Sequence, residues 1–233
     1  MAAPTRFPSG VTNAAPGTNT GMYGVPDPSA WHTYFNDFDT FAAAEWTITT
    51  TEAGSGSATE ALTDADGGVL LITNDNADND NDLFQKVGES FLMAAGKPAL
   101  FKARFKISDA TQSDFLMGLQ ITDTTPFDAS DGIYFQKDDG STTVSAICRK
   151  NASTGSTSLT AGTIADDTYI VLGWYYDGKS SVHVFVNDAQ VGTLDGSSAY
   201  LPDTELTISF GIQNGEAAAK TMSVDYILAA KAR

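Results

Sequence analysis

Carboxylates give this 233-residue sequence its main chemical capacity, because 29 of its residues are Asp or Glu. Hydrolysis of a glycosidic bond needs two carboxylates flanking that bond, and a strand presents both on one face only at even spacing. No strand-like segment carries such a set. The six glutamates lie far apart in the sequence: Glu45, Glu52, Glu60, Glu89, Glu205 and Glu216. We therefore predict no catalytic residues and no enzymatic activity, with a meeting of distant carboxylates in space as the alternative.

The acidic segment Asn74–Asp82 offers oxygen ligands of the kind that calcium accepts, in Asp75, Asp78, Asp80 and Asp82. A helix-loop-helix calcium site also needs Gly at its sixth position and Glu at its twelfth. The segment fails at one or both positions from each start between Asn74 and Asn76. We expect an acidic loop with no metal site and no cofactor, and a bound calcium ion is the alternative.

Nucleophilic catalysis has little support in the sequence. The chain has two histidines, His32 and His183, and one cysteine, Cys148. His183 alternates with Val182 and Val184, which favours a strand position over a catalytic role. Cys148 lies on the same side of a predicted strand as Val144 and Ala146, so we predict a small core residue. A Gly-x-Ser-x-Gly motif is absent from the sequence.

A predicted β-meander at Tyr169–Leu194 dominates the second half of the chain. The strand signals Tyr169–Tyr176, Ser181–Val186 and Gln190–Leu194 are separated by turns at Asp177-Gly178 and Asn187-Asp188. Each strand can therefore pair with its neighbour in sequence.

Alternation in Phe101–Ile107 predicts an amphipathic strand with apolar residues on one face and Lys102, Arg104 and Lys106 on the other. We expect these cations to balance neighbouring acids on a solvated face, with a docking patch for an acidic partner as the alternative. About a dozen such short strands, with turn signals between them and no long helical period, predict an all-β protein, an antiparallel β-sandwich.

The first thirty residues differ from the rest and predict an extended N-terminal arm. They contain five of the eight prolines and four glycines, and Arg6 and Asp27 are their only charges. Proline and glycine disfavour helix and central strand. We divide the chain into an arm (1–30) and a β-sandwich domain (31–233). The spaced apolar residues of the arm predict that it lies on another protein surface.

Charge and hydropathy exclude two classes of partner. The net charge is −16, so the body repels phosphate and we expect no nucleic-acid partner. The mean hydropathy is −0.14 and no apolar run is long enough to span a bilayer, so we expect no membrane partner. The first residues lack the apolar stretch of a signal peptide, which predicts synthesis in a cytoplasm.

Two parts of the sequence resemble known families. The body, from about Trp31 to Leu228, resembles concanavalin A-like lectin/glucanase and laminin-G type sandwiches, through Trp174-Tyr-Tyr-Asp-Gly-Lys179 and Val184-Phe-Val-Asn-Asp-Ala-Gln-Val-Gly-Thr193. The resemblance implies a concanavalin A-like jelly roll, and the carboxylate motif of the glucanase members is missing at every strand. The start, Pro4-Thr-Arg-Phe-Pro-Ser-Gly-Val-Thr-Asn13, resembles small virion proteins of tailed bacteriophages that carry a lectin-like body.

The second resemblance implies a capsid decoration or cement protein on the surface of a virion made in a host cytoplasm. Its partners would be the major capsid protein and neighbouring copies of itself, as a homo-oligomer on the capsid. The expected partner-binding residues lie in the arm: Arg6, Phe7, Pro8, Val11, Met22, Tyr23 and Val25. The alternative function is a carbohydrate-binding module or adhesin for glycans, which would use loop aromatics such as Phe127 and Tyr200.

Overall fold

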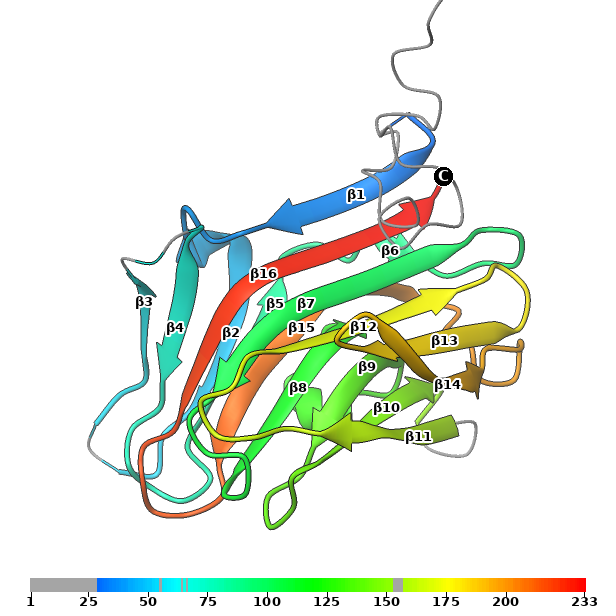
Figure 1. Cartoon of the computed structure of the whole chain (residues 1–233). Helices are drawn as coiled ribbons and strands as arrows, with labels where there is room; N and C mark the ends of the chain where they lie inside the picture. The colour runs from blue at the N-terminus through cyan, green and yellow to red at the C-terminus, as the bar shows by residue number, and fades with distance from the viewer. Residues whose placement is uncertain (1–28, 55, 64, 66, 153–156) are drawn as a thin grey trace, which may run out of the picture.

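The computed structural model describes residues 29–54, 56–63, 65, 67–152 and 157–233. In this part of the chain two antiparallel sheets face each other, so the predicted β-sandwich is confirmed (Figure 1). We call the sheets sheet 1 and sheet 2.

Sheet 1 contains, in spatial order, β14 (Ala189–Asp195), β13 (Ser181–Val186), β12 (Ile170–Tyr176), β7 (Ala99–Ile107), β16 (Thr221–Ala232), β4 (Val69–Thr73) and β3 (Thr59–Thr63), with β1 (Trp31–Asn36) also paired to β16. Sheet 2 contains β11 (Thr157–Thr163), β10 (Thr143–Arg149), β9 (Gly132–Lys137), β8 (Ser113–Gln120), β15 (Glu205–Asn214), β5 (Asn81–Lys86) and β2 (Trp46–Thr51), with β6 (Phe91–Leu92) also paired to β15. Two single 3-10 turns complete the described elements, η2 (Ala43–Glu45) and η3 (Pro126–Asp128).

The predicted meander is confirmed as β12, β13 and β14, which pair in sequence order. Gly178 has a φ of 76° in the first turn, which favours glycine. There the Asp177 carboxylate accepts hydrogen bonds from the backbone N–H groups of Lys179, Ser180 and Ser181. These local bonds fix the register of the hairpin.

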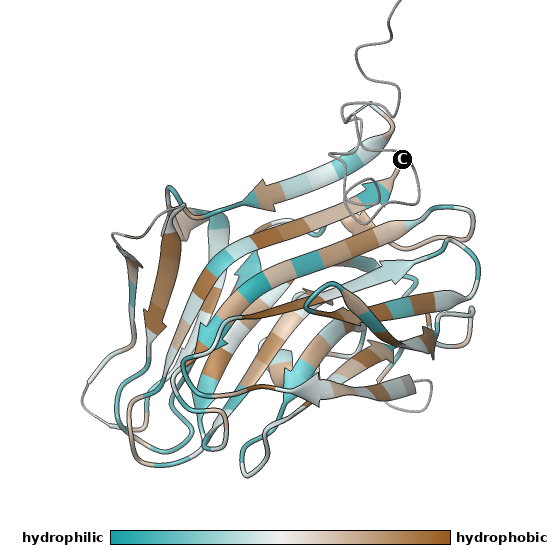
Figure 2. Ribbon diagram, viewed as in Figure 1, coloured by the Kyte–Doolittle hydropathy of each residue, from teal (hydrophilic) through white to brown (hydrophobic). Residues whose placement is uncertain are grey.

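The core lies between the sheets. Along β7 the residues alternate between buried and half-buried, as the sequence predicted, and Figure 2 shows the matching bands of hydropathy. From sheet 2, Phe84 and Phe210 stack at 5.0 Å between ring centroids. Trp174 of β12 donates a hydrogen bond from its Nε1 to the backbone O of Ile133 in β9 at 3.1 Å, so one buried side chain links the two sheets.

Three strands have no clear local signal in the sequence: β3, the two-residue β6, and β11. Of these, β3 and β11 are Thr-containing outer strands at the ends of the sheet paths, so each gains its structure chiefly from pairing on one side rather than from an apolar pattern.

The two long sides of the sandwich differ. On one side β11 of sheet 2 contacts β14 of sheet 1. On the other side the outer strands are β2 of sheet 2 and β3 of sheet 1, and polar residues come directly after each of them in the sequence.

None of the helical segments in the described ranges has the length and hydropathy to cross a membrane.

Candidate functional site

The outward face of sheet 2 carries a row of hydrogen-bonding side chains. Asn81 of β5, Gln213 of β15 and Asp114 of β8 are neighbours across three adjacent strands. Their positions alternate with the core residues Phe84, Ile212 and Phe115, which places them on the outside. We call Asn81, Gln213 and Asp114 the polar row.

Hydrogen bonds hold the polar row in one arrangement. The Asn81 Nδ2 donates to the Gln213 Oε1 at 3.2 Å, and the Gln213 Nε2 donates to the Asp114 Oδ2 at 3.2 Å. The Gln213 Nε2 also donates to the Oδ1 of Asn79, which lies in the loop before β5, at 3.2 Å. The Asn81 Oδ1 is buried and has no hydrogen-bond partner among the described residues.

Asp114 is the titratable member of the polar row. Burial raises its pKa to about 6, and the negative charges of Asp139 and Asp138 add to the rise, while a hydrogen bond from the backbone N–H of Asp139 opposes it. Near neutral pH this carboxyl therefore exchanges between an acceptor and a donor state. A carboxyl with a raised pKa beside other carboxylates is a pattern found at functional sites.

The other half of this face is closed by the chain itself. The loop after β8, residues 121–131, is held by the Gln85 Nε2, which donates to the backbone O of Ile121 at 3.0 Å, and by the Gln120 Nε2, which donates to that of Pro126 at 3.0 Å. Tyr134, on the outward side of β9, is buried. Ligand access is therefore expected at Gln213 and Asp114 of the polar row, which are half-buried, whereas Asn81 is buried beside them.

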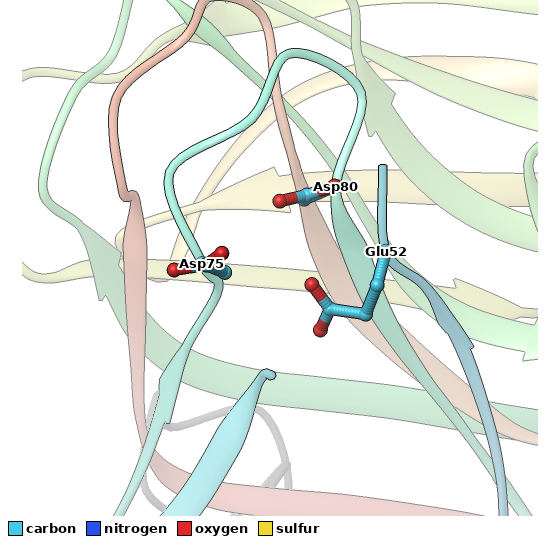
Figure 3. Close-up of side chains that lie close together, drawn as sticks. All are labelled: Glu52, Asp75 and Asp80. Carbon is cyan, nitrogen blue, oxygen red and sulfur yellow. The ribbon is translucent and has the colours of Figure 1, made fainter. Parts of the chain in front are cut away.

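A second cluster lies at the β2 and β3 side of the sandwich. Glu52 follows β2, while Asp75 and Asp80 belong to the loop between β4 and β5 (Figure 3). One carboxylate oxygen from each lies within 4.8 Å of the others. We call Glu52, Asp75 and Asp80 the carboxylate triad. Asp78, from the acidic segment Asn74–Asp82, is exposed and is not among them.

Asp82 and Glu60 extend the acidic region around the triad. Asp82 is fully buried, and its Oδ1 accepts a hydrogen bond from the Thr50 Oγ1 at 2.7 Å. Burial raises the pKa of Asp82 to about 7, and the carboxylates of Glu60 and Glu52 raise it further. This is the meeting of distant carboxylates that the sequence left open as an alternative, because Glu52 and Glu60 both act on Asp82. Their meeting depends on the packing of β3 beside β2 and β5, which the sequence did not indicate.

The remaining candidate residues have structural surroundings. Cys148 is buried in the core as predicted, and burial raises the pKa of its thiol to about 12. His183 lies in β13 as predicted, with its ring stacked on Tyr175 at 6.2 Å between centroids. His32 lies in β1, with its Nε2 3.1 Å from the Ser90 Oγ.

The basic face of β7 is balanced by acids, as expected. Lys102 pairs with Asp188 at 2.6 Å and Lys106 pairs with Asp167 at 3.3 Å, while Arg104 pairs with Asp225. The Arg104 guanidinium also lies 3.9 Å from the centroid of the Tyr169 ring. This arrangement supports a solvated sheet face rather than a docking patch.

The loop aromatics of the glycan hypothesis are only half-exposed. Phe127 lies in η3 of the loop that closes part of the outward face, and Tyr200 packs against the core. The seven arm residues predicted to contact a partner lie outside the described residues: Arg6, Phe7, Pro8, Val11, Met22, Tyr23 and Val25. The sequence did not single out the polar row, because its members are polar residues on three separate strands and no local spacing connects them.

Neither a protein-family model nor a curated protein matches the sequence. Solved structures do match its fold. An endo-1,3-beta-glucanase from Streptomyces sioyaensis is 13% identical, with a TM-score of 0.60 over 89% of this chain and 98% of the other. A Bacteroides ovatus GH16 protein of a mixed linkage glucan locus, in complex with a G4G4G3G product, is 14% identical, with a TM-score of 0.62 over 83% and 98%. The carbohydrate recognition domain of Emp46p in its potassium-bound form is 9% identical, with a TM-score of 0.56 over 83% and 94%.

At this level of identity the likeness shows the fold, which is the predicted concanavalin A-like sandwich. The prediction that the protein is not an enzyme is contradicted, because endo-glucanases are among the similar structures. The sequence argument failed because it required both carboxylates on one strand, whereas folding gathers carboxylates from several strands. The capsid decoration role stays a prediction from the arm, and none of the similar structures described above supports it.

Proposed function

We propose that this protein binds carbohydrate through the polar row on the outward face of sheet 2. The fold is shared with proteins that their names describe as glucanases and as a carbohydrate recognition domain. These names support carbohydrate as the proposed ligand class, and the geometry of the polar row supports it as the proposed site.

The observation that carries the proposal is the hydrogen-bonded order of the polar row. Planar amides and a carboxyl group offer donors and acceptors that match sugar hydroxyls. Adjacent strands are about 4.8 Å apart, so the three side chains span about 10 Å, which suits a short oligosaccharide. Because the row is already fixed by its own hydrogen bonds, binding orders few further side chains.

Affinity for soluble β-1,3-glucan and mixed-linkage β-glucan tests the proposal, measured by isothermal titration calorimetry with the full chain. We expect Gln213→Ala to weaken binding by about tenfold, because it removes the central residue of the row and one of the two acceptors of the Asn81 amide, the other being the backbone O of Asn79. Gln190→Ala is the matched control, since Gln190 is exposed on β14 of sheet 1. Equal affinity in the wild type and the Gln213→Ala variant would place the glycan site elsewhere.

A second candidate function at the same row is glycoside hydrolysis. It is favoured by the raised pKa of Asp114 beside Asp138 and Asp139, because glycosidases use one carboxyl group as an acid and a second carboxylate as a base or nucleophile. Release of reducing ends from the same glucans, lost in Asp114→Asn, would support hydrolysis. No release during prolonged incubation with saturating glucan would leave binding as the function.

A further inference from the structure

We propose that the carboxylate triad, Glu52, Asp75 and Asp80, binds a calcium ion. The site lies at the β2 and β3 side of the sandwich, between the end of β2 and the loop that joins β4 to β5 (Figure 3). It is separate from the polar row and does not depend on the glycan proposal.

The spacing of the triad suits calcium. One oxygen from each residue lies within 4.8 Å of the other two. Oxygens bound to one calcium ion at about 2.4 Å can be up to about 4.8 Å apart, so the three carboxylates can reach a single ion. A purely oxygen donor set also selects calcium over softer transition metals.

A buried oxygen without a partner is the second observation. The Glu52 Oε1 accepts a hydrogen bond from the backbone N–H of Ala58, whereas the Glu52 Oε2 is buried and has no hydrogen-bond partner among the described residues. A buried acceptor that lacks a donor costs free energy, and a cation satisfies several such oxygens at once.

The charge of the region is not balanced by the protein. Five acidic residues gather there, the carboxylates of Glu52, Glu60, Asp75 and Asp80 and the buried Asp82, which becomes a fifth carboxylate above about pH 7. None of the ion pairs formed between described residues includes any of the five: those pairs involve Glu45, Asp188, Asp225, Asp167, Asp128, Asp203, Asp109 and Glu216. A divalent cation supplies the missing positive charge.

The surrounding backbone holds the ligands in place without the ion. The Asp80 carboxylate accepts hydrogen bonds from the backbone N–H groups of Ala53 at 2.7 Å and Ala77 at 3.0 Å. The Asn214 Nδ2 donates to the backbone O atoms of Asp75 at 2.7 Å and Ala77 at 2.9 Å. At Gly56 a Cβ atom would collide with the Asp75 carboxylate, so this glycine leaves room for the ligand. Calcium therefore meets a largely formed site.

Thermal unfolding of the calcium-depleted full chain, with calcium, magnesium or potassium chloride added, tests the proposal. At a free calcium concentration about a hundredfold above the dissociation constant we expect the Tm to rise by about 5–10 °C, and magnesium and potassium to do less. Glu52→Gln and Asp75→Asn each remove one ligand charge and should each raise the calcium dissociation constant by about tenfold or more.

Asp78→Asn is the matched control, because Asp78 is an exposed carboxylate of the same loop outside the triad. It should keep the wild-type calcium response, which separates coordination from general charge reduction. Because Glu52→Gln and Asp75→Asn are both measured, the test still holds if one of them misfolds. The proposal is overturned if millimolar calcium leaves the wild-type Tm unchanged, if potassium acts equally, or if Glu52→Gln and Asp75→Asn both respond like the wild type.

Discussion

Asp82 provides a quantitative test of the acidic region. Burial raises its pKa from 3.8 to about 7 in the folded protein. The folded state therefore holds a proton that the unfolded state has lost between about pH 4 and pH 7. Stability falls as the pH rises through this window, and the difference of about three units corresponds to about 4 kcal/mol at most. Above about pH 7, in calcium-free solution, the whole of this contribution to the free energy of unfolding is lost.

Asp82→Asn removes this dependence. Its amide keeps an acceptor for the Thr50 hydroxyl and offers a donor in place of the retained proton. We expect the variant to be more stable than the wild type by about 2–4 kcal/mol at pH 8, and equal to it near pH 4. Urea unfolding at several pH values with calcium removed measures both free energies. Asp78→Asn is the control, since it removes an exposed charge from the same loop.

Two results would refute the reasoning. A variant with the same slope of stability against pH as the wild type would show that Asp82 does not titrate in this window. A variant that is less stable at every pH would show that its carboxylate is stabilised in the folded protein without calcium.

Two further predictions follow from the contacts. Trp174→Phe should lower the free energy of unfolding by about 1–3 kcal/mol, because it removes the buried hydrogen bond to the backbone O of Ile133, and urea unfolding measures the loss; a change within error would contradict a role for this bond. Removing calcium should weaken glycan binding several-fold if both proposals hold, because the loop that carries Asp75 and Asp80 also carries Asn79, whose Oδ1 accepts a hydrogen bond from Gln213. Calorimetry with and without a chelator measures the two affinities. Equal affinities would show that the two sites are independent.

The sequence predicted the fold wherever local patterns decide it. The meander and the strand Phe101–Ile107 were found because turn residues and alternation are local signals. The outer strands β3 and β11 were missed, since main-chain pairing forms them and no apolar alternation marks them.

The candidate site was less predictable. The sequence showed that the loop containing Asp75 and Asp80 is rich in possible calcium ligands but favoured no metal site, and Glu52 comes from another strand end that only packing brings there. Asn81, Gln213 and Asp114 are neighbours solely through the strand order of sheet 2. Strand order of this kind cannot be obtained from residue patterns on single strands.

Nuclear magnetic resonance of the side-chain amides is the most direct test of carbohydrate binding at the polar row. The Asn81 and Gln213 NH2 signals report on the row itself, and that of Gln190 reports on sheet 1. During titration with a β-1,3-glucan oligosaccharide we predict progressive shifts of the Asn81 and Gln213 signals and none for Gln190. Unchanged Asn81 and Gln213 signals at saturating oligosaccharide would contradict the proposed site.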